Sequence, residues 1–233
     1  MMENFDRIVK DFAQIPVDRV KKVKVGVVGE IYIKYAPLGN NNLERFLLSE
    51  DTEVYVPGVT DFILFKIDNR LEDSKLYGGG FFKKPAVKWL FNYVHRAQLN
   101  MIAAVKKEPK FEAPSDFLHI KTLVKDYIGY GAKMGEGWLL TAEMLELIDS
   151  GVENIVCAQP FGCLPNHVAG KGMIRKIKST YPDANIVAID YDPGATEVNQ
   201  ENRIKLMLAV ARSKMEKQRQ SQDAKTALSE SKV

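Results

Sequence analysis

The sequence has few of the residues that metal chemistry requires. Its 233 residues include only two cysteines, Cys157 and Cys163, and three histidines. Two cysteines in a chain that we expect to be cytoplasmic are more typical of free thiols or metal ligands than of a structural disulfide. A cubane iron–sulfur cluster requires about four thiolates, so this chain cannot complete such a site with its own sulfur atoms.

The sequence also has no long apolar run and little net charge. No stretch of about 18 apolar residues is present, so we expect no membrane span. The first residues do not have the basic and then apolar order of a secretory signal, which predicts a cytoplasmic protein. The formal net charge of +3 is too small to indicate a nucleic-acid partner. We therefore expect neither a membrane nor a nucleic acid as a partner.

Apolar and β-branched runs alternate with helical patterns along most of the chain. Strands are expected at residues 22–30, 53–56, 154–158 and 185–190. This alternation predicts an α/β protein with a mostly parallel, Rossmann-like or flavodoxin-like sheet that is flanked by helices. We expect one domain over residues 1–217, with a helical insertion at about 59–130. Residues 218–233 are polar and are expected to be disordered.

The segment 154–172 contains most of the residues with chemical potential. It begins as a buried strand, turns at Pro160 and Gly162, and leads into a helix near Asn166. In open α/β sheets, the loop after a strand is where ligands bind. Cys163 lies in this loop and is a candidate metal ligand. Cys157 lies inside the strand, where we expect it to pack as a small buried hydrophobic residue, and a role as a metal ligand is the alternative.

The spacing of Cys163 and His167 leaves two further alternatives open. Four residues separate them, which would place both side chains on one face if the helix began early. Such a pair is compatible with zinc binding or with a Cys–His nucleophilic pair.

Two carboxylates and a glycine-rich loop are candidate binding groups. Gly135, Glu136 and Gly137 precede a helix, where glycines let the backbone approach a ligand closely. Ordinary turn glycines are the alternative interpretation. Glu30 and Glu136 each follow a glycine at a predicted loop, where a carboxylate could hydrogen-bond across a cleft. Helix capping or solvent exposure is the alternative for both.

Several runs in the chain resemble the 2-hydroxyacyl-CoA dehydratase family. The most specific is Gln-Pro-Phe-Gly-Cys-Leu-Pro-Asn-His-Val at 159–168, with similar runs at 27–32, 135–140 and 188–194. The similarity covers roughly residues 20–210 and is closest to the C-terminal dehydratase-like region of the large proteins that are fused to an ATP-dependent activase. By its place in the run at 159–168, Cys163 resembles a cluster ligand of that family.

The resemblance implies a Rossmann-like domain that supports a [4Fe–4S] cluster in an ATP-driven electron-transfer system. An acyl-CoA dehydratase or reductase would be the enzyme that such a system serves. The other cluster cysteines of the family are absent here. We therefore expect that the chain is inactive alone, and that a cysteine-bearing dehydratase-like domain or subunit and an activase are its partners.

Two alternatives remain beside this hypothesis. One is a binding module that docks a partner protein or an acyl-CoA without a metal. The other is a homodimer that shares a metal across its axis through Cys163 of both chains.

Overall fold

The computed structural model describes residues 2–80 and 82–230, and side chains up to residue 223. The chain divides into two compact units, and each is described by itself. The helical unit contains Met1–Val20 and Pro57–Glu146, and the sheet unit contains Lys21–Val56 and Leu147–Val233. The insertion expected at 59–130 lies within the helical unit. The helical unit also includes the N-terminal helix, and it extends to Glu146.

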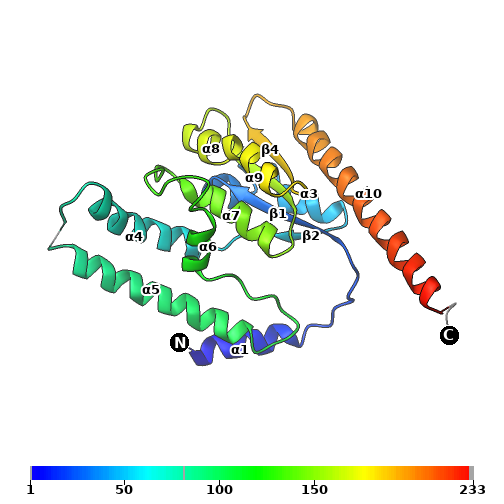
Figure 1. The fold of residues 1–233 in the computed structure, drawn as a ribbon, viewed down its shortest axis with the longest axis horizontal. Helices are drawn as coiled ribbons and strands as arrows, with labels where there is room; N and C mark the ends of the chain where they lie inside the picture. Colours follow the sequence, from blue (N-terminus) through cyan, green and yellow to red (C-terminus); the bar gives the residue numbers. More distant parts are fainter. Residues whose placement is uncertain (1, 81, 231–233) are drawn as a thin grey trace. The chain divides into compact units, whose positions relative to one another are not determined.

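The sheet unit is built on a four-stranded, all-parallel sheet with the order β2-β1-β3-β4 (Figure 1). The strands are β1 (Val23–Gly29), β2 (Thr52–Tyr55), β3 (Asn154–Pro160) and β4 (Asn185–Tyr191). All four strands were expected from the sequence, with end points that differ by one or two residues. The fold class is therefore confirmed.

The helices of the sheet unit are short except for the last. They are α2 (Ile31–Tyr35), α3 (Leu43–Ser49), α8 (Leu164–Ala169), η1 (Lys171–Met173), α9 (Ile174–Thr180) and α10 (Glu197–Glu230). Alternate residues of β1, such as Val25 and Val27, pack with Leu47 of α3 and Leu208 of α10 in one core. A parallel sheet buries both faces in this way, which explains the nearly continuous apolar sequence of β1 and β3.

The helix α10 extends farther than the sequence predicts. We expected it to end near residue 217 and to be followed by disorder, but it continues to Glu230 (Figure 1). Among its side chains up to residue 223, the last buried one is Ala211, so packing against the sheet accounts for the first half of the helix. Good helix-forming residues such as Gln, Lys and Ala fill the remainder. Residues 231–233 lie outside the described part of the chain.

The helical unit is organised around one aromatic cluster. Its helices are α1 (Met2–Ala13), α4 (Val59–Leu76), α5 (Lys84–Val105), α6 (Phe117–Leu123) and most of α7 (Trp138–Asp149). The Trp138 ring packs edge-on against Phe65 at 5.0 Å between ring centroids, and also contacts Phe117 and Tyr130. These contacts assign the start of α7 to the helical unit. No helix in the described part of the chain is both long and apolar enough to cross a bilayer.

Candidate functional site

A pocket of about 850 Å³ lies in the sheet unit where β1 and β3 end. The chain leaves β1 toward β2 on one side, and β3 pairs with β1 on the other. Loops after such a pair of strands diverge and leave a crevice at the carboxyl end of the sheet, which is the usual ligand site of open α/β folds. The pocket walls come from α2, the loop after it, the β3–α8 loop and the end of β4.

Cys163 forms part of the pocket wall and is partly exposed. It is the N-cap residue of α8, and its carbonyl oxygen accepts a hydrogen bond from the amide of His167 at 2.9 Å. Its own amide donates to the carbonyl oxygen of Pro160 at 3.2 Å. Both backbone groups of Cys163 are therefore held, and only its side chain is available to a ligand.

The sulfur atom of Cys163 accepts a hydrogen bond from Nδ2 of Asn166 at 3.2 Å. Asn166 is completely buried one turn along the helix, so its amide is fixed by packing. The thiolate, not the thiol, is the form of a cysteine that binds metals or acts as a nucleophile.

Glu30 borders the same pocket and caps α2. Its Oε2 accepts a hydrogen bond from the amide of Ile33 at 2.9 Å, and its own amide donates to the carbonyl oxygen of Ala158 at 3.1 Å. Of the roles considered for Glu30, the structure shows the helix cap. Only one carboxylate oxygen is used in the cap, so the other can face a ligand.

The opposite wall is a loop with unusual backbone geometry. Asn41 and Asn42 both have left-handed conformations, with φ of 51° and 56°. Asn41 donates from Nδ2 to Oε1 of Gln200 at 2.9 Å, and Gln200 donates to the carbonyl oxygen of Asp190 at 3.1 Å. Asparagine tolerates this conformation better than most residues, and strained backbone is often found at binding sites. The hydrogen bonds connect this wall to α10 and β4.

A polar network centred on Asp190 lies beside the pocket. Oδ1 of Asp190 accepts hydrogen bonds from Gln159 at 2.6 Å and interacts with His167 at 3.0 Å, and Oδ2 lies 3.1 Å from Nζ of Lys171. Burial by itself would raise the pKa of Asp190, but the hydrogen bonds from Gln159, His167 and Lys171 lower it below its usual value. The network therefore joins β3, β4, α8 and η1 around an ionised carboxylate.

Tyr191 adds a neutral hydroxyl-bearing residue to the pocket wall. Its ring belongs to the core that β1, α3 and α10 form, and only 7% of the residue is exposed. Burial raises the pKa of Tyr191, so the phenol stays protonated at all physiological pH values. It is therefore a hydrogen-bond donor, not an anion, toward a ligand.

The structure does not form the expected Cys163–His167 pair. His167 turns its Nε2 toward Asp190, whereas the sulfur atom of Cys163 is hydrogen-bonded to Asn166. In the part of the chain that the structure describes, no group of three or more His, Cys, Asp or Glu side chains is arranged to hold a metal ion. These contacts favour neither the zinc nor the Cys–His alternative.

Cys157 is completely buried in β3, in agreement with the packing interpretation. A side chain at Gly170 would come within 3.1 Å of its sulfur atom, so the small residue of the α8–η1 turn leaves room for the thiol. We do not assign a ligand role to Cys157.

The glycine-rich loop that contains Gly135, Glu136 and Gly137 belongs to the helical unit, whereas Glu30 and both cysteines belong to the sheet unit. The loop is closed by the amide of Trp138, which donates to the carbonyl oxygen of Ala132 at 2.6 Å. Gly137 has φ of 49°, and a side chain there would collide with the backbone of Ala132. These contacts support the turn-glycine alternative, in which Gly137 is required by the fold.

Glu136 in that loop is almost completely buried. Lys66 of α4 donates to the carbonyl oxygen of Gly135 at 2.5 Å. Burial lowers the pKa of Lys66, and the negative charge of Glu136 partly opposes this change. The loop backbone is thus held within the helical unit.

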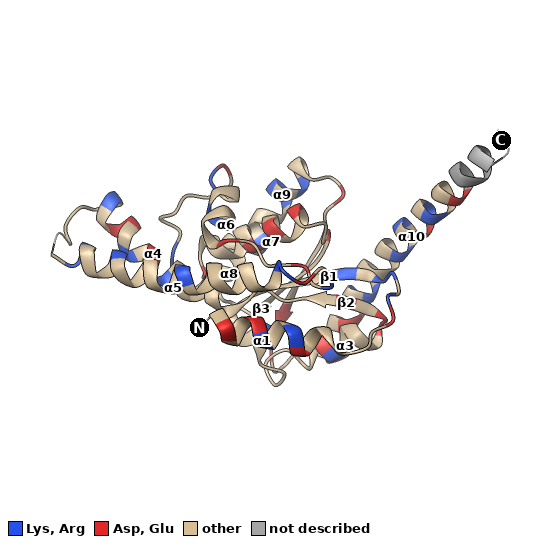
Figure 2. Ribbon diagram, turned by 90° about the horizontal axis from the view of Figure 1, so that it is seen from below, with Lys and Arg blue, Asp and Glu red and all other residues tan. Residues whose placement is uncertain are grey.

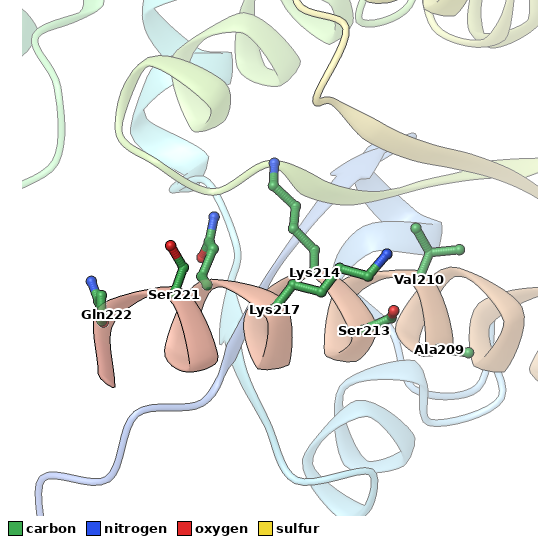
Figure 3. Close-up of a pocket in the computed structure, with 8 residues that line it drawn as sticks. Ala209, Val210, Ser213, Lys214, Lys217, Ser221 and Gln222 are labelled. Atoms are coloured by element: carbon green, nitrogen blue, oxygen red, sulfur yellow. The ribbon is translucent and has the colours of Figure 1, made fainter. Parts of the chain in front are cut away.

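A larger hollow of about 1070 Å³ lies along the side of α10 (Figure 3). All of its lining residues belong to this one helix, and they are mostly serine, glutamine and lysine side chains. Lys214 among them is ion-paired with Glu153 at 2.7 Å. This open surface has neither the enclosure nor the convergent polar groups of the pocket at Cys163.

Sequence reasoning missed several members of the site. Asp190 ends an expected strand and Gln159 follows another, but neither is among the candidate site residues that the sequence indicates, although the two are paired neighbours at the ends of β4 and β3. Polar residues at the same end of adjacent parallel strands are a signal that could have identified this network. The positions of Tyr191 and Asn41 depend on loop geometry, which the sequence pattern does not show.

Comparisons with family models, with curated proteins and with solved structures find no match for this chain.

Proposed function

We propose that this chain is a component of an iron–sulfur redox system and that Cys163 supplies one thiolate to a cluster at the pocket. One observation carries the proposal. Of the two cysteines, one is enclosed in β3, and the other lies partly exposed on the wall of the pocket where β1 and β3 end. The family resemblance supports the same residue as a cluster ligand.

The residues of the chain fit one ligand position and not a complete cluster site. A cubane cluster uses about four thiolates, and Cys163 is the single accessible thiol among the described residues. The remaining thiolates would come from a cysteine-bearing dehydratase-like chain. The bound cluster would supply one-electron redox chemistry for an acyl-CoA dehydratase or reductase, and an ATP-dependent activase would supply the electron.

The chain's own residues would orient and tune that thiolate. The backbone contacts of Cys163 fix its position, and the amide of buried Asn166 donates to its sulfur atom. Hydrogen bonds to cluster sulfur atoms raise the reduction potential by stabilising the more negative, reduced state.

The test is capture of a preformed cluster under anaerobic conditions. A synthetic [4Fe–4S] cluster that carries small exchangeable thiolates is mixed with the purified chain, which is then desalted. The expected result is retention of iron and sulfide with visible charge-transfer absorption, because the Cys163 thiolate replaces one of the small ligands.

The two cysteines provide matched variants for this test. Cys163→Ala should abolish retention, and Cys157→Ala should retain as much iron as the wild type. Equal retention by the wild type and by Cys163→Ala, or loss in Cys157→Ala alone, would overturn the proposed ligand role.

A second candidate function is a binding module for the acyl part of an acyl-CoA. The pocket volume of about 850 Å³ is in the range of small-molecule sites. Its walls carry the carboxylates of Glu30 and Asp192 but no lysine or arginine, which disfavours the phosphates of CoA. Calorimetric titration should then show similar affinity for an acyl-CoA and for the matching acyl-pantetheine. Binding that persists in Cys163→Ala would separate this function from cluster binding.

A further inference from the structure

A long stretch of the helical unit contains no acidic residue. Residues 74–107 have no Asp or Glu and have seven Lys or Arg residues. This stretch covers the end of α4, the turn after it and all of α5 (Figure 2). Lys83, Lys84, Lys88 and Arg96 are exposed, and within the described residues none of them forms an ion pair with a carboxylate. Their charges are therefore available to a partner.

The turn between α4 and α5 exposes large apolar side chains. Gly78, Gly79 and Gly80 all have positive φ, between 72° and 77°, and they reverse the chain direction. Tyr77 before them is 72% exposed, and Phe82 after them is 94% exposed. Phe82 is followed at once by Lys83 and Lys84, so an apolar tip is bordered by two positive charges.

The outward face of α5 continues this surface. Trp89, Tyr93 and Arg96 share one face of the helix by their spacing of four and seven residues, whereas Phe91, Gln98 and Ile102 are buried on another. Trp89 is 67% exposed and Tyr93 is 56% exposed, and their rings stack at 5.8 Å between centroids. Exposed aromatic side chains next to unpaired cations indicate a binding surface.

The chemistry of this surface favours a lipid headgroup layer over a protein. Protein interfaces are enriched in arginine and depleted in lysine, but three of its four unpaired cations are lysines. Lysines beside Trp, Tyr and Phe are typical of surfaces that bind in the interface of an anionic bilayer. A second copy docked face to face would place the same positive charges against one another.

We infer that the α4–α5 turn and the outward face of α5 form a docking surface for an anionic lipid membrane. Phe82, Trp89 and Tyr93 enter the headgroup region, and Lys83, Lys84, Lys88 and Arg96 contact lipid phosphates. The interaction is peripheral, and it differs from the sequence-based expectation of no membrane partner. It involves none of the residues of the Cys163 pocket and is independent of the proposed redox function.

The test is sedimentation of the full chain with vesicles of phosphatidylcholine alone or mixed with phosphatidylglycerol. Binding is expected only to the anionic vesicles and should weaken as salt is added. Tryptophan emission should shift to shorter wavelength on binding, because exposed Trp89 enters the bilayer while Trp138 is already buried.

Charge-matched variants locate the surface. Lys83→Glu/Lys84→Glu should weaken binding at least about tenfold, since each basic residue near the membrane contributes roughly fivefold. Arg175→Glu/Lys178→Glu, on exposed positions of α9, makes the same change in net charge and should bind like the wild type. Phe82→Ser should weaken binding and reduce the emission shift, which a purely electrostatic contact would not do.

Three outcomes would overturn the inference. The first is no binding to anionic vesicles. The second is an equal effect of the α9 variant and the Lys83/Lys84 variant. The third is tighter binding to single-stranded DNA or to polyglutamate than to the vesicles, which would identify a nucleic acid or an acidic protein segment as the partner. Circular dichroism checks that each variant is folded.

Discussion

The two thiols of this protein lie six residues apart and differ completely in their surroundings. Cys157 is enclosed in the sheet, and Cys163 is partly exposed at the pocket. Because β3 ends at Pro160, the chain leaves the sheet between the two cysteines. A difference of this kind can be measured directly, since reaction of a thiol requires access.

We expect the thiol of Cys163 in the native protein to react rapidly with an aromatic disulfide reagent. The thiol of Cys157 should react at least about 100-fold more slowly, because its exposure requires opening of the sheet. Cys163→Ser should remove the fast reaction, and Cys157→Ala should preserve it. Two fast thiols in the native wild type would contradict this assignment.

The Asp190 network predicts a pH dependence of stability. The pKa of Asp190 is lowered in the folded state, so its contribution is present above its unfolded pKa of about 3.9 and is lost as pH falls through the folded value. Asp190→Asn should destabilise the protein by about 1–2 kcal/mol near neutral pH.

In urea unfolding, the difference between the wild type and Asp190→Asn should shrink below about pH 4. Asp223→Asn, at an exposed position of α10, should show little difference at any pH. If the difference in free energy of unfolding between the wild type and Asp190→Asn stays constant down to pH 3, the ionised carboxylate is not what stabilises the network.

At the scale of elements, the junction of β1 and β3 decides where the pocket forms. Gly29 is the last residue of β1 and pairs with Ala158 of β3. Its φ of 150° is rare for residues with a side chain, and a Cβ there would collide with the carbonyl oxygen of Ala158. The colliding atoms of Ala158 belong to the backbone of the central strand β3, so no side-chain movement could relieve this collision.

Gly29→Ala should therefore destabilise the protein by about 3 kcal/mol or more. Gly58→Ala provides the matched control, because a Cβ at Gly58 meets no atom within 4 Å. Its effect should stay within about 0.5 kcal/mol. Chemical denaturation measures both changes, and similar costs for the two variants would show that the strand junction tolerates a side chain.

The helix α4 shows, at the same scale, why the sequence pattern does not identify every helix. The sequence of residues 60–67 is compatible with a strand or with a helix, and that of residues 69–84 with a flexible excursion. In the structure α4 buries polar residues beside apolar ones, namely Asp61, Asp68, Asn69 and Glu72. Hydrophobic periodicity detects a helix only when its buried face is apolar, so this helix was hidden from pattern analysis.

At the scale of the whole molecule, the two units differ in what their cores contain. The core of the sheet unit is largely apolar. The helical unit buries an ion-pair network, in which Nζ of Lys121 lies 2.6 Å from Asp68 and 2.8 Å from Glu72. Burial opposes the charge of Lys121, but its hydrogen bonds to both carboxylates raise its pKa above the usual value.

Removal of the Lys121 charge should destabilise the helical unit by about 3–5 kcal/mol, because buried Asp68 loses its ion-pair partner and Glu72 keeps only its contact with Lys75. In Lys121→Met, hydrogen exchange should become faster in α4 and α6 and remain unchanged in β1 and β3. Lys125→Met, at an exposed position nearby, should leave exchange unchanged. Equally accelerated exchange in both units would show that they unfold as one.

The sequence by itself determined the sheet of this protein. Strands β1, β3 and β4 are short, largely apolar and rich in β-branched residues, which is the composition expected of strands that are buried on both faces. The place of Cys163 followed in the same way, since the proline and glycine residues around it exclude a continuous strand or helix.

Only the tertiary structure decided which residues meet. Asp190 contacts His167 and Lys171 because β3 and β4 are adjacent, and Trp138 joins the helical unit because its ring packs on Phe65 and Phe117. The local pattern of apolar and polar residues indicates whether a residue is buried, because burial repeats with the period of a helix or a strand. It does not report the neighbour across the fold, because that neighbour is set by packing between segments far apart in the chain.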